Sequence, residues 1–232
     1  MTTDTNDASG IPIVIDDPAI PPMWFVAPDG FHALPVLADP DERGAAADEF
    51  VRGLFPEGDS HIWDSAGPFY AALTEVFADF GLAYSAMGVF GDDDGGIVHV
   101  SFTVGGVESS HRTPEQAVEA IALGLSRDPL TDTRRITLPC GPAVSNITIR
   151  EVTIGAELTA SGEEAKLLTG QIQILVPFPN APFTAVFTLD TAAMDHWGEI
   201  CDMTSLILRT VSFTDPEQTP EEVPGAGRLT TT

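Results

Sequence analysis

Apolar and polar residues alternate along this chain with two periods, and the period switches several times. A period near 3.6 residues is typical of a helix and a period of two is typical of a strand. Helical spacing covers residues 40–55, 68–80, 114–125 and 192–209. Extended segments cover 23–36 (two short pieces), 82–90, 97–104, 134–138, 144–154, 167–176, 183–189 and 210–213. Adjacent strands interrupted by helices predict an α+β fold, with a largely antiparallel sheet flanked by helices.

Local signals predict where several helices begin and which faces they bury. Asp39 is the expected cap of the first helix, with Pro40 as its first residue. Thr113 is the expected cap of the third helix, with Gln116 placed to close a capping box. For the helix over 68–80, the spacing predicts a buried apolar face of Phe69, Leu73, Val76, Phe77 and Phe80.

The order strand, strand, helix occurs twice, which bears on domain organisation. We expect one α+β domain over 22–214, with two ββα-containing halves, 22–130 and 131–214, as an alternative division. The acidic, proline-interrupted segments 1–21 and 215–232 predict disordered ends. Within the first of these, "IPIVI" at 11–15 is a candidate edge strand or partner-binding segment.

Composition narrows the classes of partner. The 232 residues carry a formal net charge of −25, and Lys166 is the only lysine among ten basic residues. Such a surface repels nucleic-acid phosphates and anionic lipids, so we expect neither nucleic-acid nor membrane binding. The arginine bias resembles that of actinobacterial proteins, with an acid-rich halophile as the alternative. The sequence shows no apolar stretch of about 18 residues and no signal-peptide pattern, which predicts a cytoplasmic protein.

The stretch "FGDDDGGIVHV", residues 90–100, raises the question of a metal site. An EF-hand loop needs ligands at alternate positions and a bidentate acid at the twelfth. Here Asp92, Asp93 and Asp94 are contiguous, and the twelfth position from Asp92 is Thr103. Asp and Gly suit a tight turn between strands, so the pattern predicts a hairpin.

The strand after this turn offers the first candidate ligand site. Alternation places His99, Ser101 and Thr103 together on one polar face, opposite the apolar Val100 and Phe102. That face is either solvated or the floor of a pocket for a small molecule or substrate. The pocket alternative predicts a cavity over the face, with an Asp or Glu hydrogen-bonded to His99.

Signatures of catalysis and of cofactor binding are absent from the sequence. The histidines have no HxH, HxxxH or HExxH spacing, and there is no GxSxG, phosphate loop or Rossmann fingerprint. Cys140 and Cys201 are expected to be structural thiols, since neither lies in a CxxC motif. We therefore predict no catalytic residue, no metal site and no cofactor, and a non-enzymatic protein.

The segment "ILVPFPNAPFTAVF" supplies a second candidate site. Phe178 and Phe183 lie near the tip of a proline-rich turn between two apolar strands. Exposed, they would anchor a protein partner, because an apolar patch on an acidic surface is typical of an interface. The alternative is that Phe178 packs under the turn.

The strand pair "GQIQILVPFP"/"FTAVFTLD", the helix carrying Trp197 and the closing "LRTVSF" resemble the C-terminal part of Mog1/PsbP-like domains. The resemblance covers about residues 170–213 and implies an antiparallel sheet flanked by helices in a non-catalytic binding or assembly module. The leading prediction is therefore an accessory protein that binds a protein partner. The alternative is a small-molecule binder or enzyme using the face of His99.

Overall fold

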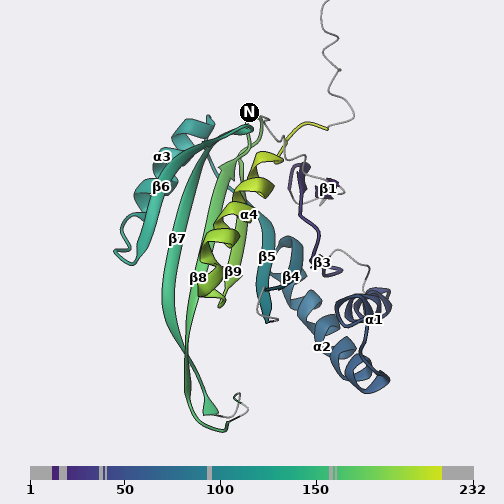
Figure 1. Ribbon diagram of the computed structural model, residues 1–232. Helices are drawn as coiled ribbons and strands as arrows, with labels where there is room; N and C mark the ends of the chain where they lie inside the picture. Colours follow the sequence, from purple (N-terminus) through teal and green to yellow (C-terminus); the bar gives the residue numbers. More distant parts are fainter. Residues whose placement is uncertain are drawn as a thin grey trace, which may run out of the picture.

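The described part of the chain contains two antiparallel sheets and four α-helices, as the computed structural model shows (Figure 1). The structure describes residues 12–15, 20–36, 39, 41–92, 96–156, 159 and 161–215. The small sheet pairs β1 (Pro12–Ile15) with β2 (Met23–Val26). The large sheet has the order β3-β4-β5-β9-β8-β7-β6, and every neighbouring pair is antiparallel. The predicted α+β class with an antiparallel sheet is confirmed.

The strands of the large sheet agree closely with the period-two runs of the sequence. Their bounds are β3 (Phe31–Ala33), β4 (Leu82–Gly91), β5 (Ile97–Glu108), β6 (Thr131–Leu138), β7 (Gly141–Ile154), β8 (Ala165–Pro177) and β9 (Phe183–Thr191). The helices are α1 (Arg43–Leu54), α2 (Ser60–Asp79), α3 (Pro114–Leu125) and α4 (Trp197–Arg209), with a short 3₁₀ turn η2 (Met194–His196) before α4.

One face of the large sheet is the apolar core. α4 lies across β8 and β9 on this face (Figure 1), and β1 and β2 add Ile15, Met23 and Phe25 to the same cluster. The inward residues of α4 are Ile200, Ile207 and Leu208. The core is continuous from β4 to β8, so both ββα units of the sequence contribute to it.

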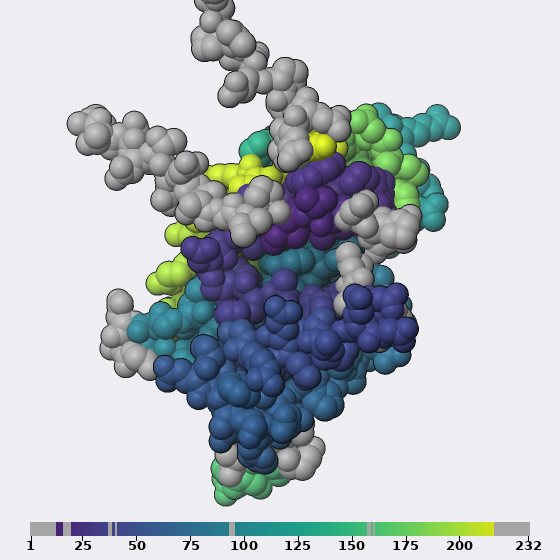
Figure 2. Space-filling model, turned by 90° about the vertical axis from the view of Figure 1, so that its right-hand side faces the viewer, coloured from purple at the N-terminus to yellow at the C-terminus, as the bar shows by residue number. Residues whose placement is uncertain are grey.

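The opposite face of the large sheet is polar and only partly covered. α3 packs on β6, β7 and β8, while α1 and α2 pack on each other and on β3 and β4. Figure 2 shows α1 and α2, in blue, in the lower part of the face turned toward the viewer. A stretch of polar sheet face therefore remains between α3 and the α1–α2 pair.

The two ββα units join through one strand pair. β9 inserts between β5 and β8, so Ser101 lies opposite Asp190, and Asp190 lies opposite Gln171. The strand order thus makes one sheet from the predicted halves 22–130 and 131–214.

The first two helices depart from their predicted bounds. α1 begins at Arg43 and not near Pro40, because Asp39 closes a preceding turn: its Oδ1 accepts from the N–H of Asp41 at 3.0 Å. α2 begins at Ser60, where Asp59 Oδ1 caps the N–H groups of His61 and Ile62. Pro68 lies inside α2, so the predicted start at residue 68 was wrong.

The predicted apolar face of α2 was also wrong. Phe69, Val76 and Phe80 are 63%, 45% and 80% exposed, whereas Tyr70 and Thr74 are buried. Thr74 tolerates burial because its hydroxyl donates to the carbonyls of Tyr70 and Ala71. Contact with α1 through Gly67 and Tyr70 selects this face, and that contact is invisible in the spacing of α2 alone.

Two local predictions are confirmed. β4 and β5 form a hairpin around the aspartates, with the Asp92 N–H donating to the Gly96 carbonyl at 3.1 Å, while Asp93 and Asp94 lie outside the described residues. Thr113 caps α3 by accepting from the Gln116 N–H. The strand predicted over 210–213 was wrong, because this segment pairs only through an isolated bridge between Ser212 and Trp24.

Part of the predicted N-terminal arm lies within the described residues. Residues 12–15 form β1, as the edge-strand candidate at 11–15 predicts, and Ile15 and Ile20 are buried in the core, so the expected disorder of 1–21 does not extend to these residues. Burial of these isoleucines outweighs the local acidic and proline-rich composition. Residues 1–11 and 16–19 lie outside the described residues, as does the tail from 216 onward.

Candidate functional site

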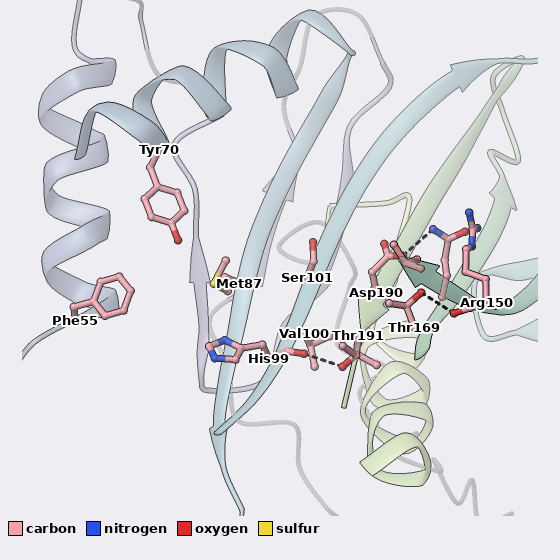
Figure 3. A pocket seen from close by; sticks show the side chains of 13 residues that line it. Phe55, Tyr70, Met87, His99, Val100, Ser101, Arg150, Thr169, Asp190 and Thr191 are labelled. Atoms are coloured by element: carbon pink, nitrogen blue, oxygen red, sulfur yellow. Dashed lines mark hydrogen bonds between the residues drawn. The ribbon is translucent and has the colours of Figure 1, made fainter. Parts of the chain in front are cut away.

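A cavity of about 640 Å³ lies over the polar face of the sheet, beside the α1–α2 pair (Figure 3). Its walls come from α1, α2, β4, β5, β7, β8 and β9, so it collects residues from most of the chain. The lining residues are Phe55, Tyr70, Met87, His99, Val100, Ser101, Arg150, Val152, Thr169, Gln171, Asp190, Thr191 and Ala192. This volume falls within the range of about 300–1,000 Å³ typical of small-molecule sites.

The floor of the cavity follows from strand register. Ser101, Asp190 and Gln171 stand side by side on β5, β9 and β8, because residues paired across antiparallel strands point to the same face. Arg150 and Thr169 form the next pair on β7 and β8, with the Thr169 hydroxyl donating to the Arg150 carbonyl at 3.3 Å. The polar floor is therefore a product of the sheet.

Asp190 is the half-buried acid at the centre of this floor. Its Oδ1 accepts a hydrogen bond from Gln171 Nε2 at 2.8 Å. Burial raises the pKa of the Asp190 carboxyl, and the hydrogen bond from Gln171 and the positive charge of Arg150 lower it only partly back. Asp190 is thus a desolvated carboxyl group held in place by a neutral amide.

The opposite wall is apolar and comes from the first half of the chain. Phe55 follows the last turn of α1, Tyr70 lies on the inner face of α2, and Met87 is on β4. Figure 3 shows Phe55, Tyr70 and Met87 on the side of the helices, across from Asp190, Arg150 and Thr169. Burial raises the pKa of the Tyr70 phenol, so this wall carries no ionised group at neutral pH.

The predicted polar face is confirmed in its orientation. His99 and Ser101 are exposed toward the cavity, Val100 and Phe102 are buried behind them, and Thr103 lies on the same face outside the cavity lining. No hydrogen bond or ion pair joins the His99 side chain to an acid in the described part of the chain. The cavity expected by the ligand-site hypothesis is present, whereas the acid expected beside His99 is not.

The raised pKa of Asp190 predicts a pH-dependent effect of Asp190→Asn. Below the ordinary pKa of about 3.9 the carboxyl is protonated in both states, and the desolvation cost is absent. As pH rises through the pKa of the folded state, the buried carboxyl ionises and its desolvation lowers the free energy of unfolding of the wild-type protein. The variant has no ionisable group at this position and shows no such loss. The free energy of unfolding of Asp190→Asn should therefore rise relative to that of wild type between about pH 4 and neutral pH. Urea titration at each pH measures the difference. A difference independent of pH would contradict this.

The two phenylalanines predicted to anchor a partner at the β8–β9 turn, Phe178 and Phe183, are not both exposed. Phe178 is 3% exposed, and its ring lies 4.3 Å from that of Phe213, measured between centroids. Phe183 is half-buried against the core. The alternative of a ring packed under the turn holds for Phe178, because the segment after α4 covers it.

A second polar cluster joins this turn to the end of β5. His111 Nε2 lies 3.2 Å from the Phe178 carbonyl, so it donates, and Nδ1 at 2.9 Å from Ser109 Oγ then accepts. Thr184 bonds the same Ser109 hydroxyl at 2.9 Å. The Ser–His contact resembles that of a nucleophile and its base. However, the Ser109 N–H is already bound to the Pro182 carbonyl and cannot stabilise an oxyanion, so the cluster is a structural clasp.

The cysteines and the potential metal ligands of the sequence do not form a further site in the described part of the chain. Cys140 and Cys201 are free and half-buried, and burial raises the pKa of each thiol, which opposes thiolate reactivity. Among the described residues, no three His, Cys, Asp or Glu side chains gather as metal ligands. None of the helices in that part of the chain is long and apolar enough to cross a membrane.

Sequence reasoning missed Asp190, Gln171, Arg150 and the aromatic wall. A weak signal existed in Gln171 and Gln173, which interrupt the apolar run of β8 with period two. Nothing in the sequence shows that β9 lies beside β5, so the row of Ser101, Asp190 and Gln171 was not predictable.

Comparison with known proteins adds little to this picture. Neither a protein-family model nor a curated protein matches the sequence. The solved structure of LpqN, involved in cell envelope biogenesis of Mycobacterium tuberculosis, aligns at 11% identity with a TM-score of 0.41, covering 88% of this chain and 91% of that one. A structure from Bacteroides thetaiotaomicron aligns at 7% identity with a TM-score of 0.29, covering 59% and 47%. At these scores neither similarity supports an inference about fold or function.

Proposed function

We propose that this protein binds a small amphipathic molecule in the cavity between the polar sheet face and the α1–α2 pair. The observation that carries the proposal is the contrast between the two walls. Phe55, Tyr70 and Met87 offer an apolar surface on one side. Asp190 and Arg150 offer polar groups on the other. Ligand sites of this kind combine apolar walls with a few placed polar groups that fix orientation.

Binding without catalysis accounts for the geometry better than an enzymatic reaction. A general base must lie within hydrogen-bond reach of a reacting proton and is commonly oriented by a further group. His99 is exposed and has no acid bonded to it among the described residues. Asp190 is oriented by Gln171, but no neighbouring nucleophile is bonded to it there. We therefore keep a non-enzymatic role as part of the proposal.

A role in binding a protein partner remains a prediction, as do the cytoplasmic location and the resemblance to Mog1/PsbP-like domains. The exposed apolar residues of α2, namely Ile62, Phe69, Val76 and Phe80, now offer more apolar surface than the β8–β9 turn. Their exposure is compatible with a partner, but it does not identify one.

Filling the cavity should abolish binding of a neutral apolar probe. We expect N-phenyl-1-naphthylamine to bind wild type saturably with a rise in fluorescence. In Thr169→Trp the indole would occupy the floor beside Arg150, and the affinity should fall by at least about tenfold, or roughly 1.4 kcal/mol. Fluorescence titration measures both.

Thr153→Trp is the matched control, because Thr153 is exposed on the same hairpin and points to the other face. Its probe affinity should equal that of wild type, and circular dichroism should show both variants folded. The proposal is overturned if wild type shows no saturable site, or if Thr169→Trp binds as wild type does.

A further inference from the structure

We infer that the molecule held in this cavity is a zwitterionic amphiphile, with its cationic group at Asp190, its anionic group at Arg150 and its apolar body against Phe55 and Tyr70. The inference rests on the proposed function and specifies its ligand. It covers both a free amino acid with an apolar side chain and a zwitterionic lipid headgroup, since both combine adjacent opposite charges with an apolar body.

The charges lining the cavity are one acid and one base. Arg150 and Asp190 are the only Lys, Arg, Asp or Glu residues among the lining residues. They lie on β7 and β9, two strands apart, with Gln171 of β8 between them. Arg150 pairs with Thr169, two residues along β8 from Gln171, which pairs with Asp190. At about 4.8 Å between neighbouring strands and about 3.4 Å per residue along them, their backbones are about 12 Å apart, and both side chains lie on the same face.

These two charges do not neutralise each other directly. In the described part of the chain no ion pair joins Arg150 to Asp190. Asp190 Oδ1 is bound to the Gln171 amide, and no hydrogen bond within that part of the chain engages the Arg150 guanidinium or Asp190 Oδ2. The site therefore presents a separated positive and negative group at the polar side of a cavity.

A ligand with a single charge fits this pair poorly. An ammonium at Asp190 adds positive charge near Arg150, and a carboxylate at Arg150 adds negative charge near Asp190. Like charges brought together in a partly desolvated site repel, so each singly charged ligand gains one contact and suffers one repulsion. A zwitterion meets both groups with opposite charges and leaves the net charge of the site unchanged.

The surrounding groups agree with this orientation. Ser101 of β5 places a hydroxyl on the floor between Asp190 and the helices, and Thr169 of β8 places one between the strands of Arg150 and Asp190. Figure 3 shows Asp190, Arg150 and Thr169 together at one side and the Phe55 and Tyr70 rings at the other. A ligand with its charged head on the floor would direct its apolar part toward these rings.

The test measures displacement of N-phenyl-1-naphthylamine by two matched series. The first contains L-phenylalanine, 3-phenylpropionate and 2-phenylethylamine. The second contains decylphosphocholine, decyl phosphate and decyltrimethylammonium. In at least one series the zwitterion should bind about tenfold to a hundredfold more tightly than either singly charged analogue, as expected for an added charged hydrogen bond. The series that shows the preference tells a free amino acid from a lipid headgroup.

Charge-neutralising variants locate the effect. Arg150→Gln and Asp190→Asn should each weaken zwitterion binding by about tenfold or more. Among the singly charged analogues, Asp190→Asn should weaken binding of the cationic one only, and Arg150→Gln should weaken binding of the anionic one only. In Asp190→Asn the new side-chain carbonyl can still accept from Gln171, which preserves the floor. Arg134→Gln, which removes an exposed arginine paired with Asp132 on β6, is the control and should change nothing.

The outcomes separate the two proposals. One outcome is that the probe binds wild type and fails to bind Thr169→Trp while, in both series, a singly charged analogue binds as tightly as the zwitterion or more tightly. In that case the zwitterion inference is wrong and the cavity site stands. Unchanged affinities in Arg150→Gln and Asp190→Asn likewise overturn the inference, because the charges of Arg150 and Asp190 would then not contribute to ligand binding. Absence of probe binding to wild type overturns both.

Discussion

Replacing Phe102 by alanine should lower the free energy of unfolding by about 3–5 kcal/mol, the range for removing a buried phenylalanine. Phe102 is 0% exposed at the centre of β5. Its ring meets Phe25, Phe31 and Tyr84 edge to face and stacks on Phe187. The variant would leave a cavity where rings from five strands (β2, β3, β4, β5 and β9) and both ββα units meet, so relaxation of the neighbours can fill it only in part. Urea denaturation followed by circular dichroism measures the loss.

Phe69→Ala provides the control for this effect. Phe69 is 63% exposed on α2, so its removal should change the free energy of unfolding by about 0.5 kcal/mol or less. The two phenylalanines thus separate the observed core from the core that helical spacing predicts. Equal losses at the two positions would show that α2 buries Phe69, and would contradict the arrangement described above.

Gly170→Ala should destabilise the protein by about 1–3 kcal/mol through overpacking. A methyl group at Gly170 would collide with the ring of Trp197, which begins α4 and lies directly on β8. The ring is half-buried against the core, so its displacement would disturb the packing between α4 and β8. We expect a lower midpoint in urea and a shifted near-ultraviolet signal from the displaced tryptophan.

Gly124→Ala is the matched substitution without a clash. Gly124 lies near the end of α3 with open space around it, so alanine should stabilise the helix by about 0.5–1 kcal/mol. The opposite signs expected at these two glycines distinguish contact with Trp197 from a general effect of replacing glycine. Stabilisation of Gly170→Ala would mean that α4 is not seated on β8 as described.

Much of the local structure was predictable because it depends on neighbours in sequence. The alternation of β5 placed His99 and Ser101 on one face and Phe102 on the other, since successive residues of a strand point in opposite directions. The turn chemistry of Asp92 and its neighbours predicted the β4–β5 hairpin. Thr113 predicted the start of α3, because its side chain satisfies an N–H group that the helix leaves free.

Predictions failed where two separate elements compete for one face. α2 has apolar residues around most of its circumference, and its own periodicity does not state which of them meet α1. Likewise Phe178 in its turn packs against Phe213, 35 positions later in the chain. Burial in both cases depends on contacts between distant segments, which local spacing does not encode.

The sequence by itself determined the α+β class, the strands, the hairpin, the acidic surface and the polar side of β5, because each follows from local periodicity or from composition. Only the tertiary structure decided that β9 lies between β5 and β8. That one insertion aligns Ser101, Asp190 and Gln171, and the packing of α1 and α2 adds Phe55 and Tyr70 above them. The candidate site depends on this strand order, since its groups come from segments with no common local pattern.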